Sequence, residues 1–137
     1  MKVEAIAQLT EEQIEDLYQL YKSTWWANNR TVPGIRKMLQ NTDIAIGLCE
    51  VESKKLVAFG RVLTDYFYRA VIWDLIVEES YRGQGLGKAL MEAIVNHPSL
   101  KEVESMSLMC FPEMVPFYEK FGFTQFDIEF MLRVGER

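Results

Sequence analysis

Three glycines at alternate positions lie between an arginine and a lysine in the segment Arg82-Gly83-Gln84-Gly85-Leu86-Gly87-Lys88. An apolar run ending at residue 77 precedes this segment, and an apolar helical pattern follows it. Glycine lets a backbone approach an anion closely, and the first turn of a helix offers unpaired N–H groups and the positive end of its dipole. Because fixed positive charge flanks these groups, the segment predicts a binding site for a phosphate or pyrophosphate.

Other phosphate-binding patterns fit this glycine segment less well. A P-loop requires G-x-x-x-x-G-K-[ST], whereas Lys88 is followed here by Ala89. A dinucleotide-binding fingerprint requires G-x-G-x-x-G, and the spacing here is G-x-G-x-G. A helix entry whose glycines serve only close packing is the remaining alternative, and the flanking Arg82 and Lys88 argue against it.

A carboxylate at Asp74 interrupts an otherwise apolar strand pattern, between Trp73 and Leu75. An unpaired buried carboxylate is costly, and burial raises its pKa toward the range of a useful general base. Asp74 is therefore our candidate base. Two alternatives stay open: an arginine or a backbone N–H satisfies the carboxylate, or a chain of water molecules removes the proton.

The elements that position these residues follow from periodicity and from capping signals. We expect strands at residues 3–7, 44–51, 56–63, 68–77, 103–109 and 125–134. We expect a first helix that begins at Thr10, with Gln13 as its capping-box partner, and a second that begins at Thr31. A third should run from the end of the glycine segment to a point before Pro98, and a fourth should span residues 112–120. This order predicts a mixed sheet with helices on its faces.

The composition is that of a single folded domain over residues 1–137. Apolar residues make up 49% of the chain and charged residues 26%, which is the balance of a globular protein. A chain of 137 residues can build one hydrophobic core and is short for two domains. The formal net charge of −5 argues against nucleic acid or an anionic membrane as a partner.

The sequence indicates neither a metal site nor a targeting segment. Cys49 and Cys110 lie in apolar surroundings with no Cys or His cluster nearby, so we expect two buried free thiols and no metal. The first residues lack the apolar core of a signal peptide, and no apolar run approaches the roughly 20 residues that cross a bilayer. We therefore expect a cytoplasmic protein.

Two short motifs lie in the second half of the chain. Arg82-Gly83-Gln84-Gly85-Leu86-Gly87 matches the pattern Q/R-x-x-G-x-G/A after a strand, and Phe117-Tyr118-Glu119-Lys120-Phe121-Gly122-Phe123 matches F-Y-x-x-x-G-F. In these motifs and in its element order, the chain resembles the GNAT superfamily of acetyl-CoA-dependent N-acetyltransferases. The resemblance implies an α/β (α+β) fold, with a mixed, mostly antiparallel six- to seven-stranded sheet flanked by about four helices.

The cofactor region carries a closer resemblance. Residues 69–77 and 81–90 are similar to the corresponding strand and loop of serotonin-type (arylalkylamine) N-acetyltransferases of plastids and cyanobacteria. Since this similarity is strongest around the cofactor, it supports the cofactor more firmly than the amine.

The resemblance also implies roles for the matching residues. Backbone groups of Leu75, Ile76 and Val77 would pair with the pantetheine arm of acetyl-CoA. Backbone N–H groups of Arg82, Gly83, Gln84, Gly85, Leu86, Gly87 and Lys88 would bind its pyrophosphate. Tyr118 would protonate the leaving thiolate, with packing of its phenol against a helix as the alternative. The family commonly has a polar residue seven positions before this tyrosine, and this chain has Phe111.

An aromatic cluster is the candidate acceptor site. By the same analogy, Trp25, Trp26, Tyr66, Phe67 and Tyr68 would wall a cleft for a small, aromatic or aliphatic primary amine, held by cation–π contact. Core packing is the alternative for any single ring. A protein or peptide N-acetyltransferase and a non-catalytic acyl-CoA-binding regulatory domain are the other functions compatible with the sequence. The last expected strand is apolar enough to pair in a homodimer or to lie inside the sheet.

Overall fold

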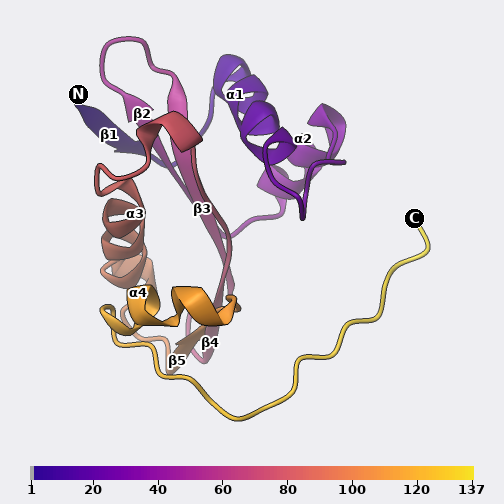
Figure 1. Ribbon diagram of the computed structural model, residues 1–137, viewed down its shortest axis with the longest axis vertical. Coiled ribbons are helices and arrows are strands. Elements are labelled where there is room, and N and C mark those ends of the chain that lie inside the picture. The colour runs from indigo at the N-terminus through magenta and orange to yellow at the C-terminus, as the bar shows by residue number, and fades with distance from the viewer. Residues whose placement is uncertain (1) are drawn as a thin grey trace.

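The computed structural model describes residues 2–137 and contains one five-stranded sheet (Figure 1). Its strands are β1 (Val3–Ile6), β2 (Ile44–Glu50), β3 (Leu56–Thr64), β4 (Arg69–Val77) and β5 (Ser105–Ser107). They lie in sequence order across the sheet. The pairs β1–β2, β2–β3 and β3–β4 are antiparallel, and β5 runs parallel to β4. The expected mixed, mostly antiparallel sheet is thus confirmed, with fewer strands than expected.

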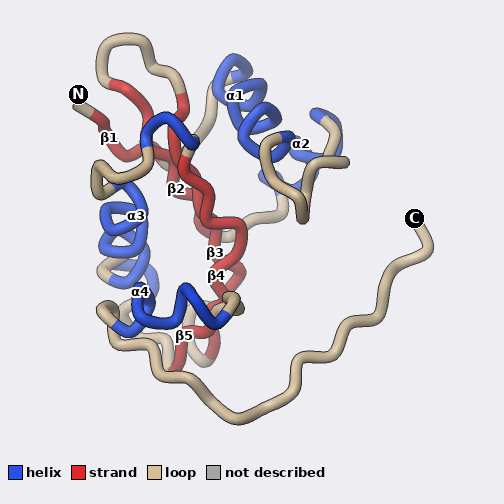
Figure 2. Tube along the Cα trace, viewed as in Figure 1, coloured by secondary structure: helices blue, strands red, loops and turns tan. Residues whose placement is uncertain are grey.

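Helices cover both faces of this sheet, as Figure 2 shows in blue against the red strands. The helices are α1 (Glu11–Lys22), α2 (Val32–Gln40), α3 (Leu86–Val95) and α4 (Val115–Glu119), with 3-10 turns at Glu79–Tyr81, Pro98–Leu100 and Pro112–Met114. One apolar core lies between α3 and the sheet, and a second lies between α1, α2 and the opposite face. The sheet therefore separates two sides, and β4 contributes side chains to both.

Local capping signals explain where the first two helices begin. Thr10 accepts a hydrogen bond from the Gln13 backbone, and the Gln13 side chain accepts one from the Thr10 backbone, so the expected capping box is present. The Thr31 side chain caps α2 by accepting from the Gly34 N–H, with Pro33 in the first turn. These contacts fix the residues at which α1 and α2 begin.

The sheet opens beside β4. β5 pairs with β4 only through Arg69, Ala70 and Val71, while β4 continues to Val77. Within residues 2–137, no strand pairs with this outer edge of β4 beyond Val71. The unpaired N–H and C=O groups of this edge can therefore form hydrogen bonds with an extended ligand, as a neighbouring strand would.

A β-bulge lies in the same part of β4. The pairing with β3 shifts between Phe59, opposite Ile76, and Arg61, opposite Trp73, so Asp74 and Leu75 together face Gly60. Asp74 has a φ of +58°, in the left-handed region that few residues other than glycine adopt. The bulge turns the Asp74 side chain to the α1 and α2 face and the Leu75 side chain to the α3 face.

The final strand expected at residues 125–134 is absent, and this prediction is wrong. After Phe123 the chain runs extended away from the sheet and the helices, as the yellow end of Figure 1 shows. Its apolar side chains are exposed, including Phe126 (74%), Ile128 (81%) and Leu132 (74%). A strand needs hydrogen bonds to a neighbouring strand, and the backbone after Phe123 forms none with the sheet in the described part of the chain.

Two smaller expectations also need correction. The strand expected at 103–109 is reduced to Ser105–Ser107, because only those residues pair with β4. Cys49 is buried as expected, but Cys110 is exposed, because it follows β5 in a segment that no element covers. Both thiols are free.

Candidate active site

The glycine segment lies between a 3-10 turn and the start of α3. Gly83 and Gly85 both have φ of +81°, and Gly85 is the N-cap of α3. Ala89 donates the first backbone hydrogen bond of the helix, to Gly85. The backbone N–H groups from Gly83 to Lys88 have no acceptor within residues 2–137. A Cβ atom at Gly83 or Gly85 would meet nothing within 4 Å, so the space before these N–H groups is open. This arrangement suits a phosphate.

Positive side chains stand at both ends of the segment. Arg82 is exposed, and its Nε donates to the Val77 carbonyl oxygen at 3.3 Å, which ties the segment to the end of β4. Lys88 Nζ lies 3.8 Å from a Glu92 carboxylate oxygen in an exposed pair. A pair of this kind is weak in water, so Lys88 remains available to an anion.

A cavity lies between α3 and α4, next to the glycine segment. Its volume is about 560 Å³, and it is lined by Lys88, Glu92, Val95, Asn96, Phe117, Lys120 and Phe121. This size is that of a small-molecule site. Because two lysines and two aromatic rings line it, the cavity offers both charge and apolar surface to a ligand that extends from the glycine segment.

Tyr118 lies on α4, on the same side of the sheet as Leu75 and Val77. Burial, and then the nearby Cys110 thiol, raise the pKa of Tyr118, so its phenol keeps its proton at neutral pH. The hydroxyl has no hydrogen-bond partner in the described part of the chain, while the ring packs against Phe117 and Phe123. The phenol is thus held by its ring, and its O–H is free to donate.

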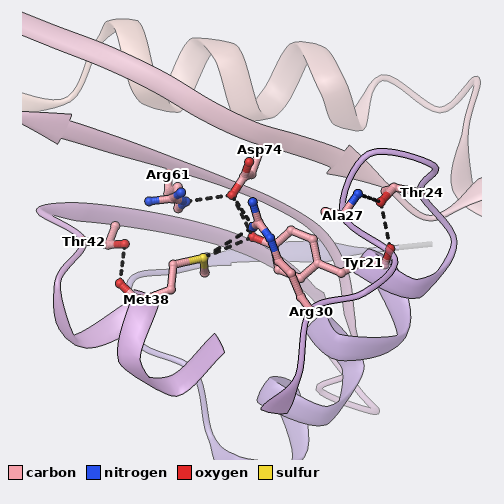
Figure 3. Close-up of polar contacts among 8 residues, drawn as sticks. All are labelled: Tyr21, Thr24, Ala27, Arg30, Met38, Thr42, Arg61 and Asp74. Carbon is pink, nitrogen blue, oxygen red and sulfur yellow. Dashed lines mark hydrogen bonds and ion pairs between the residues drawn. The ribbon is translucent and has the colours of Figure 1, made fainter. Parts of the chain in front are cut away.

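Asp74 lies at the centre of a polar network on the opposite face of β4 (Figure 3). Its Oδ2 atom accepts hydrogen bonds from the Tyr21 hydroxyl at 2.9 Å, from Arg30 Nη1 at 2.8 Å and from Arg61 Nε at 2.7 Å. The Arg30 guanidinium also lies 4.4 Å from the centroid of the Tyr21 ring. The network joins β4 and β3 to α1 and to the connection between α1 and α2.

The network decides the ionisation of Asp74. Burial alone would raise the pKa of this carboxyl, but hydrogen bonds and charge from Arg30 and Arg61 outweigh burial and lower the pKa. The expected raised pKa is therefore wrong, and the alternative in which arginine satisfies the carboxylate is confirmed. Burial, and then the charge of Asp74, raise the pKa of Tyr21, so its phenol stays a donor.

Sequence reasoning missed Tyr21, Arg30 and Arg61 as members of this site. Tyr21 fits the apolar face of α1, and the two arginines lie in different elements with no shared motif. The isolated Asp74 was the one available signal, because a carboxylate in an apolar strand demands partners.

Trp26 lies beside this network, and Trp25 precedes Trp26 in the chain. Trp26 packs edge-on against Tyr21, with ring centroids 6.2 Å apart, and Arg30 lies 5.9 Å from the Trp26 ring centroid. Trp25 contacts Phe111, with ring centroids 5.6 Å apart. Phe111 thus takes part in the aromatic surface where the family motif has a polar residue.

The structure does not bring Tyr66, Phe67 and Tyr68 to the tryptophans. These three residues form the turn between β3 and β4, where the Asp65 carboxylate accepts from the backbone of Phe67 and Tyr68. Tyr68 immediately precedes β4, whereas Asp74 lies near its other end, and at about 3.3 Å per residue the two are about 20 Å apart. No aromatic contact joins the turn residues to Trp25 or Trp26 within residues 2–137, so their part in the acceptor site stays a prediction.

Two further properties concern the kind of protein. Among residues 2–137, no group of three His, Cys, Asp or Glu residues is placed to hold a metal ion. In the same residues, no helix has the length and apolar character needed to cross a membrane.

Known sequences similar to this chain carry acetyltransferase names. It is 32% identical over 112 residues to the uncharacterized N-acetyltransferase ycf52 of Pyropia yezoensis, covering 80% of this chain and 64% of that protein. It is 39% identical over 72 residues to the chloroplastic GCN5-related N-acetyltransferase 2 of Arabidopsis thaliana, covering 53% and 28% of the two chains. The chain thus spans less than two thirds of the length of these relatives.

The fold and the family pattern agree with these relatives. A crystal structure of a GNAT-family protein from Xanthomonas campestris superposes with a TM-score of 0.82 at 25% identity, covering 96% of this chain and 94% of that one. The model of the acetyltransferase (GNAT) family matches residues 8–123, which include both glycine and tyrosine motifs, the bulged strand and the polar network. The chain therefore belongs to the GNAT family of acetyltransferases.

Proposed function

We propose that this chain transfers the acetyl group of acetyl-CoA to a primary amine. The observation that carries the proposal is the run of unpaired backbone N–H groups from Gly83 to Lys88 beside the open edge of β4. A phosphate site and a free strand edge, placed end to end, match a molecule with a pyrophosphate and an amide-bearing arm. Acetyl-CoA has both, and it supplies the acetyl group as a thioester.

The residues present fit this cofactor in three places. The N–H groups from Gly83 to Lys88 would hold the pyrophosphate, with Arg82 and Lys88 adding charge. The backbone of Leu75, Ile76 and Val77 would pair with the pantetheine arm as an added strand. The cavity containing Lys88 and Lys120 is available to the remaining part of the molecule.

Tyr118 is the proposed acid. Transfer forms a bond between the amine nitrogen and the acyl carbon and breaks the carbon–sulfur bond, so the leaving sulfur needs a proton. The raised pKa of Tyr118 keeps its phenol protonated at neutral pH, and the hydroxyl has no hydrogen-bond partner among residues 2–137. It would deliver its proton to the leaving sulfur and regain one from water. Backbone N–H groups near Leu75 to Val77 would stabilise the oxyanion.

Asp74 is the less suitable base. Its Oδ2 already accepts three hydrogen bonds and its pKa is lowered, so it has little affinity for the proton of an amine. We therefore assign the removal of the amine proton to water, and we assign to Asp74 the positioning of Arg30 and Arg61. An amine that enters in its neutral form then attacks directly.

The proposed acceptor site lies along Trp25, Trp26 and Phe111. Trp25 (73% exposed) and Phe111 (55% exposed) offer ring surface to a ligand, which favours a small amine with an aromatic or aliphatic body. An arylalkylamine, as in the serotonin-type enzymes that residues 69–77 and 81–90 resemble, meets this description. Tyr66 and Tyr68 lie in the turn before β4, and we do not include them in this proposed site.

The release of free CoA across a panel of amines tests this proposal. The panel contains arylalkylamines, aliphatic amines, amino acids, a lysine-containing peptide and a peptide with a free N-terminus, and each is incubated with acetyl-CoA. Thiol release with small amines supports the proposal, and release with the peptides alone identifies a protein or peptide N-acetyltransferase. Tight acetyl-CoA binding with no release from any acceptor identifies a non-catalytic binding domain and contradicts the proposal.

We further propose that the chain forms a homodimer through residues 124–134. Apolar side chains alternate there at Phe126, Ile128, Phe130, Leu132 and Val134, which is the pattern of a strand with one buried face. All five are exposed in the single chain. β5 is the last strand of the sheet, so its outer edge is unpaired within residues 2–137. The segment of one copy would add a strand to this edge in the second copy and cover apolar side chains such as Met109.

A further inference from the structure

Two guanidinium groups share a single carboxylate in the polar network. Arg30 Nη1 and Arg61 Nε both contact the same oxygen, Asp74 Oδ2. Neither arginine forms another ion pair within residues 2–137, and the Tyr21 phenol is uncharged. The cluster therefore carries one positive charge in excess, in a chain whose formal net charge is −5.

The donors left over on the two arginines reach solvent. Arg30 Nη1 donates to Asp74 and to the Met38 sulfur, and Arg61 Nε donates to Asp74. No hydrogen bond from another nitrogen of either guanidinium is present within residues 2–137. The single buried side-chain nitrogen or oxygen without a partner in the described residues is Glu78 Oε2, so no unpaired arginine nitrogen is sealed from water. The side chains are 31% exposed for Arg30 and 14% exposed for Arg61.

The two arginines are held in place before any ligand arrives. The Arg30 guanidinium lies over the rings of Tyr21 and Trp26, and Arg61 is anchored to the bulge residue Asp74 (Figure 3). A planar guanidinium with free N–H groups matches the oxygens of a carboxylate or a phosphate. Because the side chains are already ordered, binding an anion costs less conformational entropy than at a flexible surface.

The cluster lies at one end of the proposed acceptor site. Trp26 contacts Arg30 and adjoins Trp25 in the chain, and Trp25 contacts Phe111. Phe111 precedes the 3-10 turn Pro112–Met114, which leads directly into α4 and Tyr118. The aromatic rings thus extend from the arginines to the segment that enters the helix of the proposed acid. Since excess positive charge disfavours an ammonium group, the amine nitrogen belongs at the Tyr118 end.

We propose that Arg30 and Arg61 bind a carboxylate or phosphate group of the acceptor, so that the substrate is an amine that also carries an anion. This inference rests on the proposed acetyltransferase function and specifies its substrate class. The anion would occupy the arginine end, and the aromatic rings would contact the body between the two groups.

Binding of simple probes tests the anion site without any catalytic step. Phenylacetate and phenyl phosphate are titrated into the protein, with phenylacetamide as the neutral match of phenylacetate, and tryptophan fluorescence reports binding because Trp26 adjoins Arg30. We expect at least one anion to bind about tenfold or more tightly than phenylacetamide. Equal affinity of the three probes would overturn the proposal.

Matched arginine variants separate this site from general charge. Arg30→Gln removes a network guanidinium, and Arg36→Gln removes an exposed guanidinium that pairs with Glu11 on the surface. We expect the preference for the anion to disappear in Arg30→Gln and to persist in Arg36→Gln. Arg30→Lys keeps the charge and serves where the glutamine variant fails to fold, with an intermediate preference expected. An equal loss in Arg30→Gln and Arg36→Gln would contradict the proposal.

Steady-state kinetics then compare acceptors that differ only in the anion. The KM of ethanolamine is compared with that of O-phosphoethanolamine, and the KM of n-butylamine with that of 4-aminobutyrate. The first pair measures the effect of a phosphate group, and the second measures the effect of a carboxylate. We expect a KM at least about tenfold lower for one anionic member, and loss of that difference in Arg30→Gln. Preferential use of the neutral members would contradict the substrate class. Anion binding without any acetyl transfer would instead refute the enzymatic function while leaving the anion site intact.

Discussion

Trp25 and Phe111 lie against each other with their ring centroids 5.6 Å apart, although one follows α1 and the other follows β5. The contact joins the side of the sheet that carries Arg30 and Asp74 to the side that carries Tyr118. In the proposed function, an acceptor bound beside Arg30 would reach the acetyl group along these rings, because the sheet separates the two sides.

Trp25→Ala should therefore weaken use of the amine more than use of acetyl-CoA. Trp25 is 73% exposed, so its loss should change stability little, while the acceptor loses ring surface. We expect the KM of the amine to rise about tenfold and the KM of acetyl-CoA to stay within about twofold. Phe67→Ala, which removes an exposed ring from the β3–β4 turn, is the matched control. Equal effects of the two substitutions would contradict the assigned acceptor site.

Local signals allowed much of the scaffold to be predicted from the sequence. The capping box of Thr10 and Gln13 and the N-cap at Thr31 depend on residues a few positions apart, so spacing alone indicates them. The positive φ of Gly85 at the start of α3 has the same local origin. Features of this kind need no knowledge of which segments meet in space.

Features that depend on distant partners could not be predicted. The sequence marks Asp74 as unusual, but only the fold shows that Arg30 and Arg61 reach the same oxygen and lower its pKa. The alternation from Phe126 to Val134 predicts a strand, but no strand forms there, because a strand also needs a neighbouring strand to pair with. The sequence does not state which strand that is.

Tyr118→Phe should slow turnover without weakening the binding of acetyl-CoA. The substitution keeps the ring that packs against Phe117 and removes a hydroxyl that has no partner in the described residues. We expect kcat to fall about a hundredfold, which is the usual contribution of a general acid. The KM of acetyl-CoA should stay within about twofold, and the melting temperature should be unchanged. A parallel loss of kcat and of acetyl-CoA affinity would assign Tyr118 to binding, and Tyr18→Phe on α1 provides the control.

Gly85→Asp should prevent the binding of acetyl-CoA. A side chain fits sterically at Gly85, but it points into the open space before the N–H groups, and the φ of +81° strains any replacement. Gly85→Asn adds the same strain and almost the same shape without the charge. We expect affinity by calorimetry to be about a hundredfold weaker for the aspartate than for the asparagine variant, because like charges repel across the site. Equal affinity of the two variants would place the pyrophosphate elsewhere.

Asp74→Asn should destabilise the fold in a pH-dependent manner. The Asp74 side chain is 5% exposed, and its loss leaves two guanidiniums without a counter-ion, so we expect the free energy of unfolding to fall by about 3 kcal/mol at neutral pH. Because the folded pKa of Asp74 is lowered, its contribution is complete above the unfolded pKa of about 4 and is lost as the pH falls below it. Urea unfolding between pH 7 and pH 3 measures this difference.

The pH dependence distinguishes the ion pairs from simple packing. The gap between wild type and Asp74→Asn should narrow as the pH falls below about 4. Glu11→Gln, which breaks the exposed pair with Arg36, should change stability little at either pH. A gap for Asp74→Asn that stays constant from pH 7 to pH 3 would show that the carboxylate charge does not hold the network.

Phe130→Asp should convert a dimer into a monomer. Phe130 lies on the apolar face of the alternating segment and is 61% exposed in the single chain. Burial of such a side chain in a dimer contributes about 1.5–3 kcal/mol, and a carboxylate in its place adds a desolvation cost. Gln125→Asp introduces the same charge on the alternate face and should leave the dimer intact. Sedimentation equilibrium should give twice the 16.0 kDa chain mass for wild type and for Gln125→Asp, and the single mass for Phe130→Asp. If the wild-type chain sediments as a monomer, the proposed dimer is excluded, because residues 124–134 then pair with no β5 edge of a second copy.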